Sequence, residues 1–599
     1  MPEPGLSIPR GGARWPRPLT LAAFLAAGAI LFVVSRGKWS DALTDSGREW
    51  IVPDALARGD LLYRDVVYWF GPLTPYFHAG VFRLLGSGFG ALVAAGVLSA
   101  AACLAVLYLA MRRVTEQREA LLWTALAIPA LIFMPNAGGA ILGMGFRIWH
   151  AATFALLAVW LAGSTLRPMK RSVLAGSLCA LAGLCRTEWG LAALAAVWLV
   201  EFARGESARA ALRGALLSGA GFLLLFAAGL GPFLWAAGAR SVIHESHVLL
   251  TGLPPETRTF LLAYSHLPQW QRGLAELLYS TAMWAALWLL IELLVLRKTI
   301  PFARARRTAA TILGLLPVLA LTSFLGVSGA VFFGAAPLLC LGAAIVSRFA
   351  ARDPRSASLL AFGLLGFVLS YRRPLHIGDL PYVAPPLLFA FVSAAGLLNL
   401  RMERRAADRD ERRRLRTALA VALSLLVACV FLARVRQYRD RDRASVPIAG
   451  TRGLLSAPPA VAAEIEQLAG RIRRETGPED GLVVFPEGEL LNFLAGRRNP
   501  LRHKLYIPGY LSSTNESGVL RELASASPAA VVLWQRSTEE YGRSFFGMDY
   551  GRRIRSWLDV NYTMRPFHRK GAPAEASPRF WLGLRNDRGP RAEKRGGRP

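Results

Sequence analysis

The stretch FGALVAAGVLSAAACLAVLYLA, residues 89–110, contains no charged side chain. A transmembrane helix needs roughly 20 consecutive apolar residues, so this stretch is long enough to cross a lipid bilayer. Its many alanines and glycines are small residues that let neighbouring helices pack closely in lipid. The stretch therefore predicts a membrane-spanning helix.

Apolar runs of similar character recur as far as about residue 433 in this chain of 599 residues. The chain is 53% hydrophobic and 18% charged, and its mean hydropathy is +0.35. This composition is too apolar for an ordinary soluble protein of the same length. We therefore predict an α-helical polytopic membrane protein with about thirteen crossings, near residues 19–35, 89–110, 119–134, 150–166, 172–185, 188–203, 213–236, 274–296, 309–326, 329–347, 357–370, 383–400 and 417–433.

Lysine and arginine gather in alternate connections between the predicted crossings. The basic connections include residues 112–118, 167–171, 297–307, 348–355 and 401–416. Because basic loops stay on the cytoplasmic side, the N-terminus is expected in the cytoplasm and, with an odd number of crossings, the C-terminal domain outside. These loops explain much of the formal net charge of +30, and no basic, aromatic-rich module for binding nucleic acid is present.

All five cysteines fall inside or at the ends of predicted crossings: Cys103, Cys179, Cys185, Cys340 and Cys429. A disulfide framework or a cysteine metal site is therefore not expected. The His-Glu-Ser-His stretch at residues 244–247 lacks the H-E-x-x-H frame of a zinc helix. The sequence allows a divalent cation without indicating one, and no other cofactor is predicted.

The first predicted outer loop, residues 36–72, is dense in charges and aromatic rings. Ser46 and Glu49 match the S-x-x-E pattern of a capping box, which predicts the start of a helix. Pro53 is expected to limit or kink that helix. The tryptophans and tyrosines of the loop suit the headgroup layer, where they could serve only as interfacial anchors.

Asp45 stands at the mouth of the first predicted crossing, where a carboxylate can meet both a lipid headgroup and a water-soluble acceptor. A general base must reach the proton that it removes, and partial burial can tune its pKa toward the working pH. This placement makes Asp45 a candidate base. The alternative is that Asp45 only stabilises the start of a helix through the helix dipole.

The same loop contains a family pattern. D-S-G-R-E at residues 45–49 is followed by G-D-L-L-Y-R-D at 59–65 and Y-W-F-G-P-L-T-P-Y at 68–76. These motifs resemble the first periplasmic loop of bacterial GT-C glycosyltransferases of the family 39 or dolichyl-phosphate-mannose protein mannosyltransferase-like group. The resemblance implies inverting transfer of a sugar from a polyprenyl-phosphate donor, with Asp45 as the catalytic base. Some members carry an adjacent Asp–Glu pair here; this chain has Asp-Ser-Gly-Arg-Glu instead, so Glu49 is the second catalytic candidate.

A polyprenyl-phosphate donor needs cations or hydrogen-bond donors around its phosphate as the sugar leaves. Ionisable residues at the outer ends of crossings are costly and are therefore functional candidates. The turn CRTEWG at 185–190 and the stretch YRRPLHIGDLPYVAPP at 371–386 resemble outer segments of the same family. The substrate-binding candidates are Arg48, Arg64, Asp65, Tyr68, Arg147, His150, Arg186, Glu188, Arg373 and His376. Structural roles stay open, because Arg186 and Glu188 can pair with each other and His376 can cap a helix.

Beyond residue 433, helical and strand patterns alternate, with strands expected at 481–485, 529–534 and 579–584. This alternation predicts a small α/β domain that caps or supports the acceptor side. Three polar residues follow the first strand, where α/β folds bind ligands, although ordinary loop polarity also explains them: Glu487, Glu489 and Asn492. The predicted organisation is a cytoplasmic N-terminus at 1–18, a transmembrane GT-C-like catalytic domain at 19–433, an extracytoplasmic α/β domain at 434–585 and a basic disordered tail at 586–599.

The resemblance and the topology together predict a glycosyltransferase, specifically a hexosyltransferase, in the bacterial plasma (inner) membrane. Its expected partners are a polyprenyl-phosphate-linked sugar, an envelope acceptor (lipid, polysaccharide or protein) and the bilayer. One alternative is a transporter or flippase of lipid-linked sugars, which predicts inverted repeats or charges near the middle of crossings. The other is a non-catalytic assembly protein for envelope polysaccharide, for which Asp45→Asn would leave the function intact.

Overall fold

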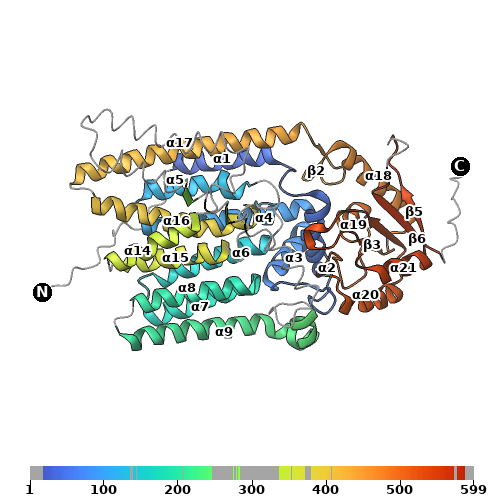
Figure 1. Ribbon diagram of the computed structural model, residues 1–599, viewed down its shortest axis with the longest axis horizontal. Coiled ribbons are helices and arrows are strands. Elements are labelled where there is room, and N and C mark those ends of the chain that lie inside the picture. The colour runs from blue at the N-terminus through green and yellow to red at the C-terminus, as the bar shows by residue number, and fades with distance from the viewer. Residues whose placement is uncertain are drawn as a thin grey trace.

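The computed structural model describes residues 18–245 apart from 135–138, 143–144 and 205–206, a few residues between 271 and 282, and residues 336–586 apart from 352–353, 371–379, 406–407 and 572–576. Within these residues the chain forms an elongated bundle of helices with a smaller domain of helices and strands at one end (Figure 1). The predicted helical body with a C-terminal α/β domain is therefore confirmed.

The apolar runs of the sequence form the bundle. Its helices are α1 Pro18–Ser35, α4 Phe89–Val114, α5 Gln117–Ala127, α6 Phe146–Ala162, α7 Pro168–Cys185, α8 Thr187–Arg204, α9 Ala208–Ala239, α14 Ala336–Ala351, α15 Pro354–Ser370, α16 Leu380–Arg405 and α17 Arg409–Asp442. In the part of the chain that the structure describes, four helical stretches are long and apolar enough to cross a membrane: Phe89–Val114, Ala208–Ile243, Ala384–Arg404 and Arg409–Asp442. The predicted crossings at 274–296 and 309–326 lie largely outside the described residues, so the total number stays a prediction.

Glycine allows the closest helix contacts in the bundle. A Cβ atom on Gly176 of α7 would lie 1.9 Å from the carbonyl oxygen of Ser218 on α9, and one on Gly96 of α4 would lie 1.8 Å from that of Ile141. No other residue fits at such distances without moving backbone. The small residues thus serve the close packing expected of helices in lipid.

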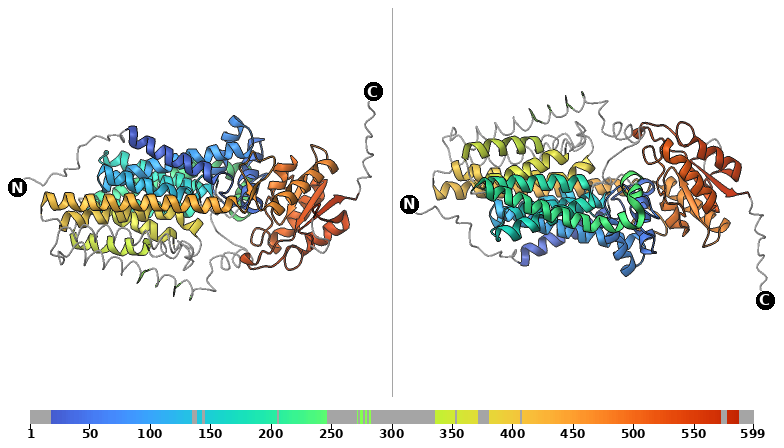
Figure 2. Two further views of the ribbon diagram at one scale, coloured as in Figure 1. Left: turned by 90° about the horizontal axis from the view of Figure 1, so that it is seen from above. Right: turned by 90° about the horizontal axis from the view of Figure 1, so that it is seen from below.

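Helix α17 connects the bundle to the C-terminal domain without a break. It contains 34 residues and runs along the bundle to the start of the terminal domain (Figure 2). Near its end, the Tyr438 hydroxyl donates a hydrogen bond of 3.0 Å to the carbonyl of Phe133, and Arg434 Nε donates one of 2.9 Å to that of Pro129. These bonds attach the last turns of α17 to the connection that follows α5.

The segment between α1 and α4, which includes the predicted first outer loop at 36–72, folds into a π-helical turn at Ala42–Ser46 (η1) and two helices, α2 Gly47–Ala57 and α3 Leu73–Leu85. The predicted capping box is wrong, because Asp41 caps the turn by accepting hydrogen bonds from the backbone of Leu43 at 3.0 Å and Thr44 at 2.9 Å. The turn precedes α2, so Ser46 already has helical backbone angles and makes no capping bond.

Of the two effects expected of Pro53, a limit or a kink, the early end of the helix is also wrong. Pro53 lies inside α2, which continues to Ala57. A proline inside a helix removes one backbone hydrogen bond, but Trp50, Ile51 and Leu56 bury the surrounding turns. Most helical stability in proteins comes from such packing, which here outweighs the lost bond.

The C-terminal domain is built on a four-stranded sheet in the order β3-β4-β6-β5. Its strands are β3 Leu482–Phe485, β4 Ala530–Trp534, β5 Tyr562–Phe567 and β6 Phe580–Arg585; its longer helices are α18 Pro459–Glu475, α19 Leu490–Ala495, α20 Ser513–Ala526 and α21 Arg552–Asn561; β1 Val446–Pro447 and β2 Ser456–Ala457 form a separate ribbon. β3 and β4 are parallel, and the other two pairs are antiparallel. The sequence analysis missed β5, which contains Pro566; proline is tolerated there because β5 is an edge strand.

Alternate residues of β3 pack on opposite faces of the sheet. Val483 and Phe485 belong to a core formed with α20 and α21. Leu482 and Val484 belong to a core formed with α18 and α19, and this core continues into the helical bundle. The face that contains α19 therefore joins the domain to the first outer loop.

Gly47 is the point of closest approach between that loop and the domain. A Cβ atom on Gly47 would lie 2.3 Å from the backbone nitrogen of Leu490, the first residue of α19. The neighbouring atoms belong to backbone and cannot rotate away. The absence of a side chain at position 47 is therefore what lets α19 rest on the start of α2.

We expect Gly47→Ala to destabilise the protein by about 1–3 kcal/mol, because the methyl group overpacks this contact. Thermal unfolding in detergent is the measurement. Gly80→Ala in α3 is the matched control: a Cβ there meets nothing within 4 Å, so loss of glycine flexibility should stabilise that helix by about 0.5–1 kcal/mol. Equal stability of the two variants would contradict the close contact.

Candidate functional site

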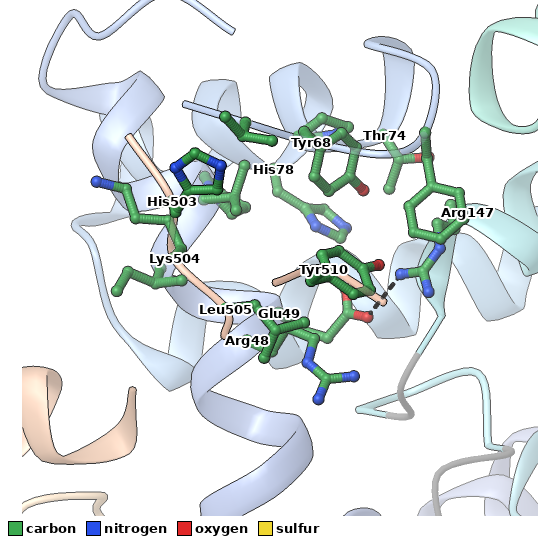
Figure 3. A pocket seen from close by; sticks show the side chains of 16 residues that line it. Arg48, Glu49, Tyr68, Thr74, His78, Arg147, His503, Lys504, Leu505 and Tyr510 are labelled. Carbon is green, nitrogen blue, oxygen red and sulfur yellow. Dashed lines mark hydrogen bonds and ion pairs between the residues drawn. The ribbon is translucent and has the colours of Figure 1, made fainter. Parts of the chain in front are cut away.

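A pocket lies where the first outer loop, the start of α6 and the C-terminal domain meet (Figure 3). The polar side chains that line it are Arg48, Glu49, Tyr68, Thr74, His78, Arg147, His503, Lys504 and Tyr510. Its free space amounts to about 50 Å³, room for a few water molecules. Figure 3 shows Glu49, Tyr68, His78, Arg147 and Tyr510 pointing toward one another, whereas the charged ends of Arg48 and Lys504 point away.

Glu49 is held in the pocket by two hydrogen-bond donors. Its Oε1 atom accepts a bond of 2.8 Å from the backbone of Gly145 and lies 3.2 Å from Nη1 of Arg147. Both side chains of the ion pair are about nine-tenths buried, with 10% and 11% of their areas exposed. A carboxylate fixed in this way orients Arg147.

Two predicted arginines meet at the ring of Phe70. The guanidinium carbon of Arg147 lies 3.9 Å from the ring centroid, and that of Arg186 lies 4.9 Å from it. Arg186 also forms an ion pair of 2.6 Å with Glu188, the structural pairing that the sequence left open. Arg147 and Phe70 line the pocket, and Arg186 lies behind them at the same ring. Two guanidinium groups, each with five N–H donors, would stabilise an anion there.

Asp45 lies in η1, one turn before Arg48 and Glu49, and does not itself line the pocket. The side chain is half-buried. Burial raises the pKa of Asp45 to about 7, against the opposing effect of the Arg48 guanidinium. A carboxyl group with this pKa is partly ionised at neutral pH, which is the condition for efficient general base catalysis.

Arg48 points into the C-terminal domain. Its Nη2 atom is paired with Glu487, a fully buried carboxylate that also pairs with Arg536. The Arg48–Glu487–Arg536 triad thus joins α2 to the ends of β3 and β4. Glu487 is therefore more than ordinary loop polarity: its buried carboxylate pairs with two arginines between the loop and the domain.

The other two polar residues after β3 behave differently. Burial raises the pKa of Glu489 to about 7, and its Oε1 atom has no hydrogen-bond partner among the described residues. Asn492 donates to the carbonyls of Leu482 at 2.9 Å and Arg497 at 3.0 Å, which is a structural role. In the described ranges, no group of three or more His, Cys, Asp or Glu side chains is placed to hold a metal ion.

The remaining predicted site residues do not line the pocket. Arg64 and Asp65 form an exposed ion pair of 2.7 Å, and Asp65 accepts a bond of 2.8 Å from the backbone of Leu61. The ring nitrogens of His150 lie 3.0 Å from the Thr74 hydroxyl and 2.7 Å from that of Ser99. Arg373 and His376 fall outside the described residues. Substrate contacts by these residues stay predictions.

The C-terminal domain supplies pocket residues that sequence analysis missed. Tyr510 stacks on Trp69 of the first loop, with ring centroids 3.7 Å apart and planes 6° apart. Arg502 Nε donates a bond of 2.7 Å to the carbonyl of Arg64. Lys504 Nζ donates one of 2.9 Å to the carbonyl of Asn499, and burial lowers the Lys504 pKa to about 8. No motif marks this segment, so only the fold reveals it.

His78 and Phe70 were also missed, although they lie in the recognised loop. His78 follows Thr74 by four residues in α3, a spacing that places both side chains on one face of a helix. That spacing was the available signal. Phe70 carries no polar atom, so its contact with two arginines has no sequence signature.

No family model matches the chain, and no curated protein matches it. Among solved structures, the chain is similar to the Archaeoglobus fulgidus oligosaccharyltransferase in the apo form, with 13% identity, coverage of 86% of this chain and 69% of that chain, and a TM-score of 0.49. It is similar to ArnT from Cupriavidus metallidurans bound to undecaprenyl phosphate, with 15% identity, coverage of 94% and 97%, and a TM-score of 0.45. It is also similar to the arabinofuranosyltransferase AftD from Mycobacteria, with 13% identity, coverage of 96% and 42%, and a TM-score of 0.46. At these identities and TM-scores, the similarities do not say what this chain does.

Proposed function

We propose that this chain is an inverting glycosyltransferase that moves a sugar, a hexose, from a polyprenyl-phosphate donor to an envelope acceptor at the outer face of the bacterial plasma membrane. One observation carries the proposal. Asp45, a carboxyl group with a pKa of about 7, lies one helical turn before residues of a pocket that Arg147 lines, and Arg186 approaches the Phe70 ring beside Arg147. A base near neutrality beside paired cations is the combination that sugar transfer from a phosphate donor needs.

In the proposed reaction, the Asp45 carboxylate takes the proton of the acceptor hydroxyl. The acceptor oxygen attacks the anomeric carbon from the face opposite the phosphate, and the bond between that carbon and the phosphate oxygen breaks. The bonding electrons leave with the polyprenyl phosphate, and the single displacement inverts the anomeric configuration. Protonated Asp45 then returns its proton to water.

The arginines act on the leaving group in this scheme. Negative charge develops on the phosphate as the bond breaks, and guanidinium donors placed beforehand stabilise that charge most in a site shielded from water. The Glu49 carboxylate keeps Arg147 in place through the ion pair of 3.2 Å. Glu49 is therefore proposed as a positioning residue, and Asp45 as the catalytic base.

The test is sugar transfer by the full chain in lipid nanodiscs. Labelled hexosyl polyprenyl phosphates are supplied with extracts of envelope acceptors, and release of polyprenyl phosphate is measured with the anomeric configuration of the product. We expect release in equal amount to product and an inverted linkage. Movement of the donor across sealed vesicles without release would instead assign the chain to lipid-linked sugar transport.

The rate of transfer should rise with pH between about pH 6 and pH 8, because a base works only after it has lost its proton. Burial raises the pKa of Asp45 to about 7, so the midpoint is expected near that value. Glu489 has a similar pKa, and Glu489→Gln is therefore the control. The midpoint of the pH profile should be the same in this variant. If the rate of Glu489→Gln no longer depended on pH, the group that titrates would be Glu489 and not Asp45.

A further inference from the structure

His78 is buried beside the pocket and has an unsatisfied ring nitrogen. Only 1% of its area is exposed, and its imidazole points into the pocket from α3 (Figure 3). Its Nε2 atom has no hydrogen-bond partner among the described residues. A buried polar atom without a partner is costly and rare in native proteins, so it calls for an explanation such as a ligand.

The neighbouring His150, by contrast, has a hydrogen-bond partner for each of its ring nitrogens. The ring centroids of His78 and His150 are 5.7 Å apart. The hydroxyls of Thr74 and Ser99 lie within hydrogen-bond distance of the two nitrogens of His150, at 3.0 Å and 2.7 Å. His150 is thus fixed by the helices around it. The Nε2 atom of His78 has no such partner among the described residues and can bond only a group in the pocket.

The protonation state of His78 selects the kind of group that it can bind. Burial, with a smaller effect of His150, lowers the pKa of His78 well below its usual value, so the imidazole is neutral. A neutral imidazole has one N–H donor and one acceptor nitrogen. A hydroxyl group can donate or accept and therefore matches Nε2 in either tautomer, whereas a phosphate oxygen can only accept and an ammonium can only donate.

The other walls of the pocket suit a sugar ring. Tyr68 and Tyr510 line the pocket with aromatic rings, against which the C–H groups of a sugar can lie. Glu49 lies 3.2 Å from Arg147 in this part of the pocket. Arg147 also contacts Phe70, which Arg186 approaches, and the phosphate-binding edge therefore adjoins the sugar-binding space.

We propose that one edge of the sugar of the lipid-linked donor enters this pocket and that Nε2 of His78 hydrogen bonds a hydroxyl of its ring. The assignment rests on the proposed function, because it takes the donor to be a sugar attached directly to a polyprenyl phosphate. His78 is then a specificity-determining residue, because it contacts the sugar and forms a hydrogen bond only where the ring carries a hydroxyl at one position. Sugars that lack a hydroxyl at that position should bind more weakly.

The experiment compares two lipids on the same protein. Binding of undecaprenyl phosphate and of hexosyl undecaprenyl phosphate to the full chain in nanodiscs is measured by tryptophan fluorescence. His78→Leu removes the hydrogen-bonding atom at similar volume, and we expect it to weaken the hexosyl lipid about tenfold while leaving the bare lipid within about twofold. His78→Gln places an amide nitrogen near the position of Nε2 and should restore most of the lost affinity.

Each outcome decides one of the two claims. Equal loss for both lipids, or no loss for either, would overturn the role of His78 while leaving the proposed function standing. Failure of the wild type to bind either lipid would overturn the proposed function and the inference with it. If His78→Leu does not fold, His78→Gln is compared with His78→Asn, whose amide reaches only the Nδ1 position; equal hexosyl binding by the two would likewise overturn the role of His78.

Discussion

Asp45→Asn should lower the rate of sugar transfer by about 10²- to 10⁴-fold, the range that a positioned general base contributes. Asparagine keeps the size and polarity of the side chain but cannot take a proton at neutral pH. Because Asp45 precedes the pocket without lining it, the binding of the donor should change little. The loss should therefore appear in kcat and leave the KM for the donor almost unchanged.

The rates are compared at matched protein levels in membranes. Asp559→Asn is the matched control, because Asp559 is a half-exposed carboxylate in α21 that pairs with Arg555 on the far face of the C-terminal sheet. That variant should retain full activity. Unchanged transfer in Asp45→Asn would remove the base assignment and, with it, the inverting mechanism in the form given above.

Glu487→Gln should destabilise the protein by about 3–5 kcal/mol, the usual cost of removing one partner from a buried ion pair. Glu487 is fully buried and pairs with both Arg48 and Arg536. Glutamine fills the same space but removes the buried negative charge that faces both guanidinium groups. Chemical denaturation in detergent measures the change, and limited proteolysis tests whether the C-terminal domain separates from the first outer loop.

Glu540→Gln provides the control for this substitution. Glu540 pairs with the same Arg536, but 47% of its side chain is exposed, so its loss should cost no more than about 1 kcal/mol. A second readout is the pH profile. Glu487 raises the pKa of Asp45, and Arg48 lowers it, so removal of the Glu487 charge should move the midpoint of activity below its wild-type position. Equal stabilities of the two variants, with an unmoved midpoint, would contradict the role of the buried triad.

The helical bundle was predictable because its signal is local and repeated. A run such as residues 89–110 is too apolar to lie in water. Helix α4, Phe89–Val114, contains the whole of it. The strands β3, β4 and β6 were predictable for a related reason: each is a short apolar run next to turn residues. β5 was not, since its burial depends on its position at the sheet edge, which no local pattern encodes.

The start of the first outer loop shows how a local rule can fail. Ser46 and Glu49 have capping-box spacing, yet Asp41 caps the turn that precedes them and Glu49 bonds to Gly145. Both alternatives give the Glu49 carboxylate a backbone N–H donor, from Ser46 in a capping box and from Gly145 in the structure. The choice between them depends on where α6 lies in the fold, which the spacing of two residues cannot reveal.

The candidate site was predictable only where its residues belong to the recognised loop or to its charged neighbours. Arg147, Arg186 and Glu188 were singled out, and the structure gathers them near Phe70. The pairing of Arg48 with Glu487 joins residues 439 positions apart, and no periodicity extends over such a separation. The domain that completes the pocket had been interpreted only as a cap or scaffold.

On the proposed placement in the membrane, the length of α17 sets how far the terminal domain lies from the lipid. A helix of 34 residues extends about 50 Å, whereas the hydrocarbon layer is about 30 Å thick. If the crossing ends near residue 433, the nine residues to Asp442 rise about 13 Å farther, through the headgroups. In that placement, the end of α17 holds the terminal domain just outside the membrane surface. Residues of the pocket can then contact the donor sugar while its polyprenyl chain stays in the bilayer.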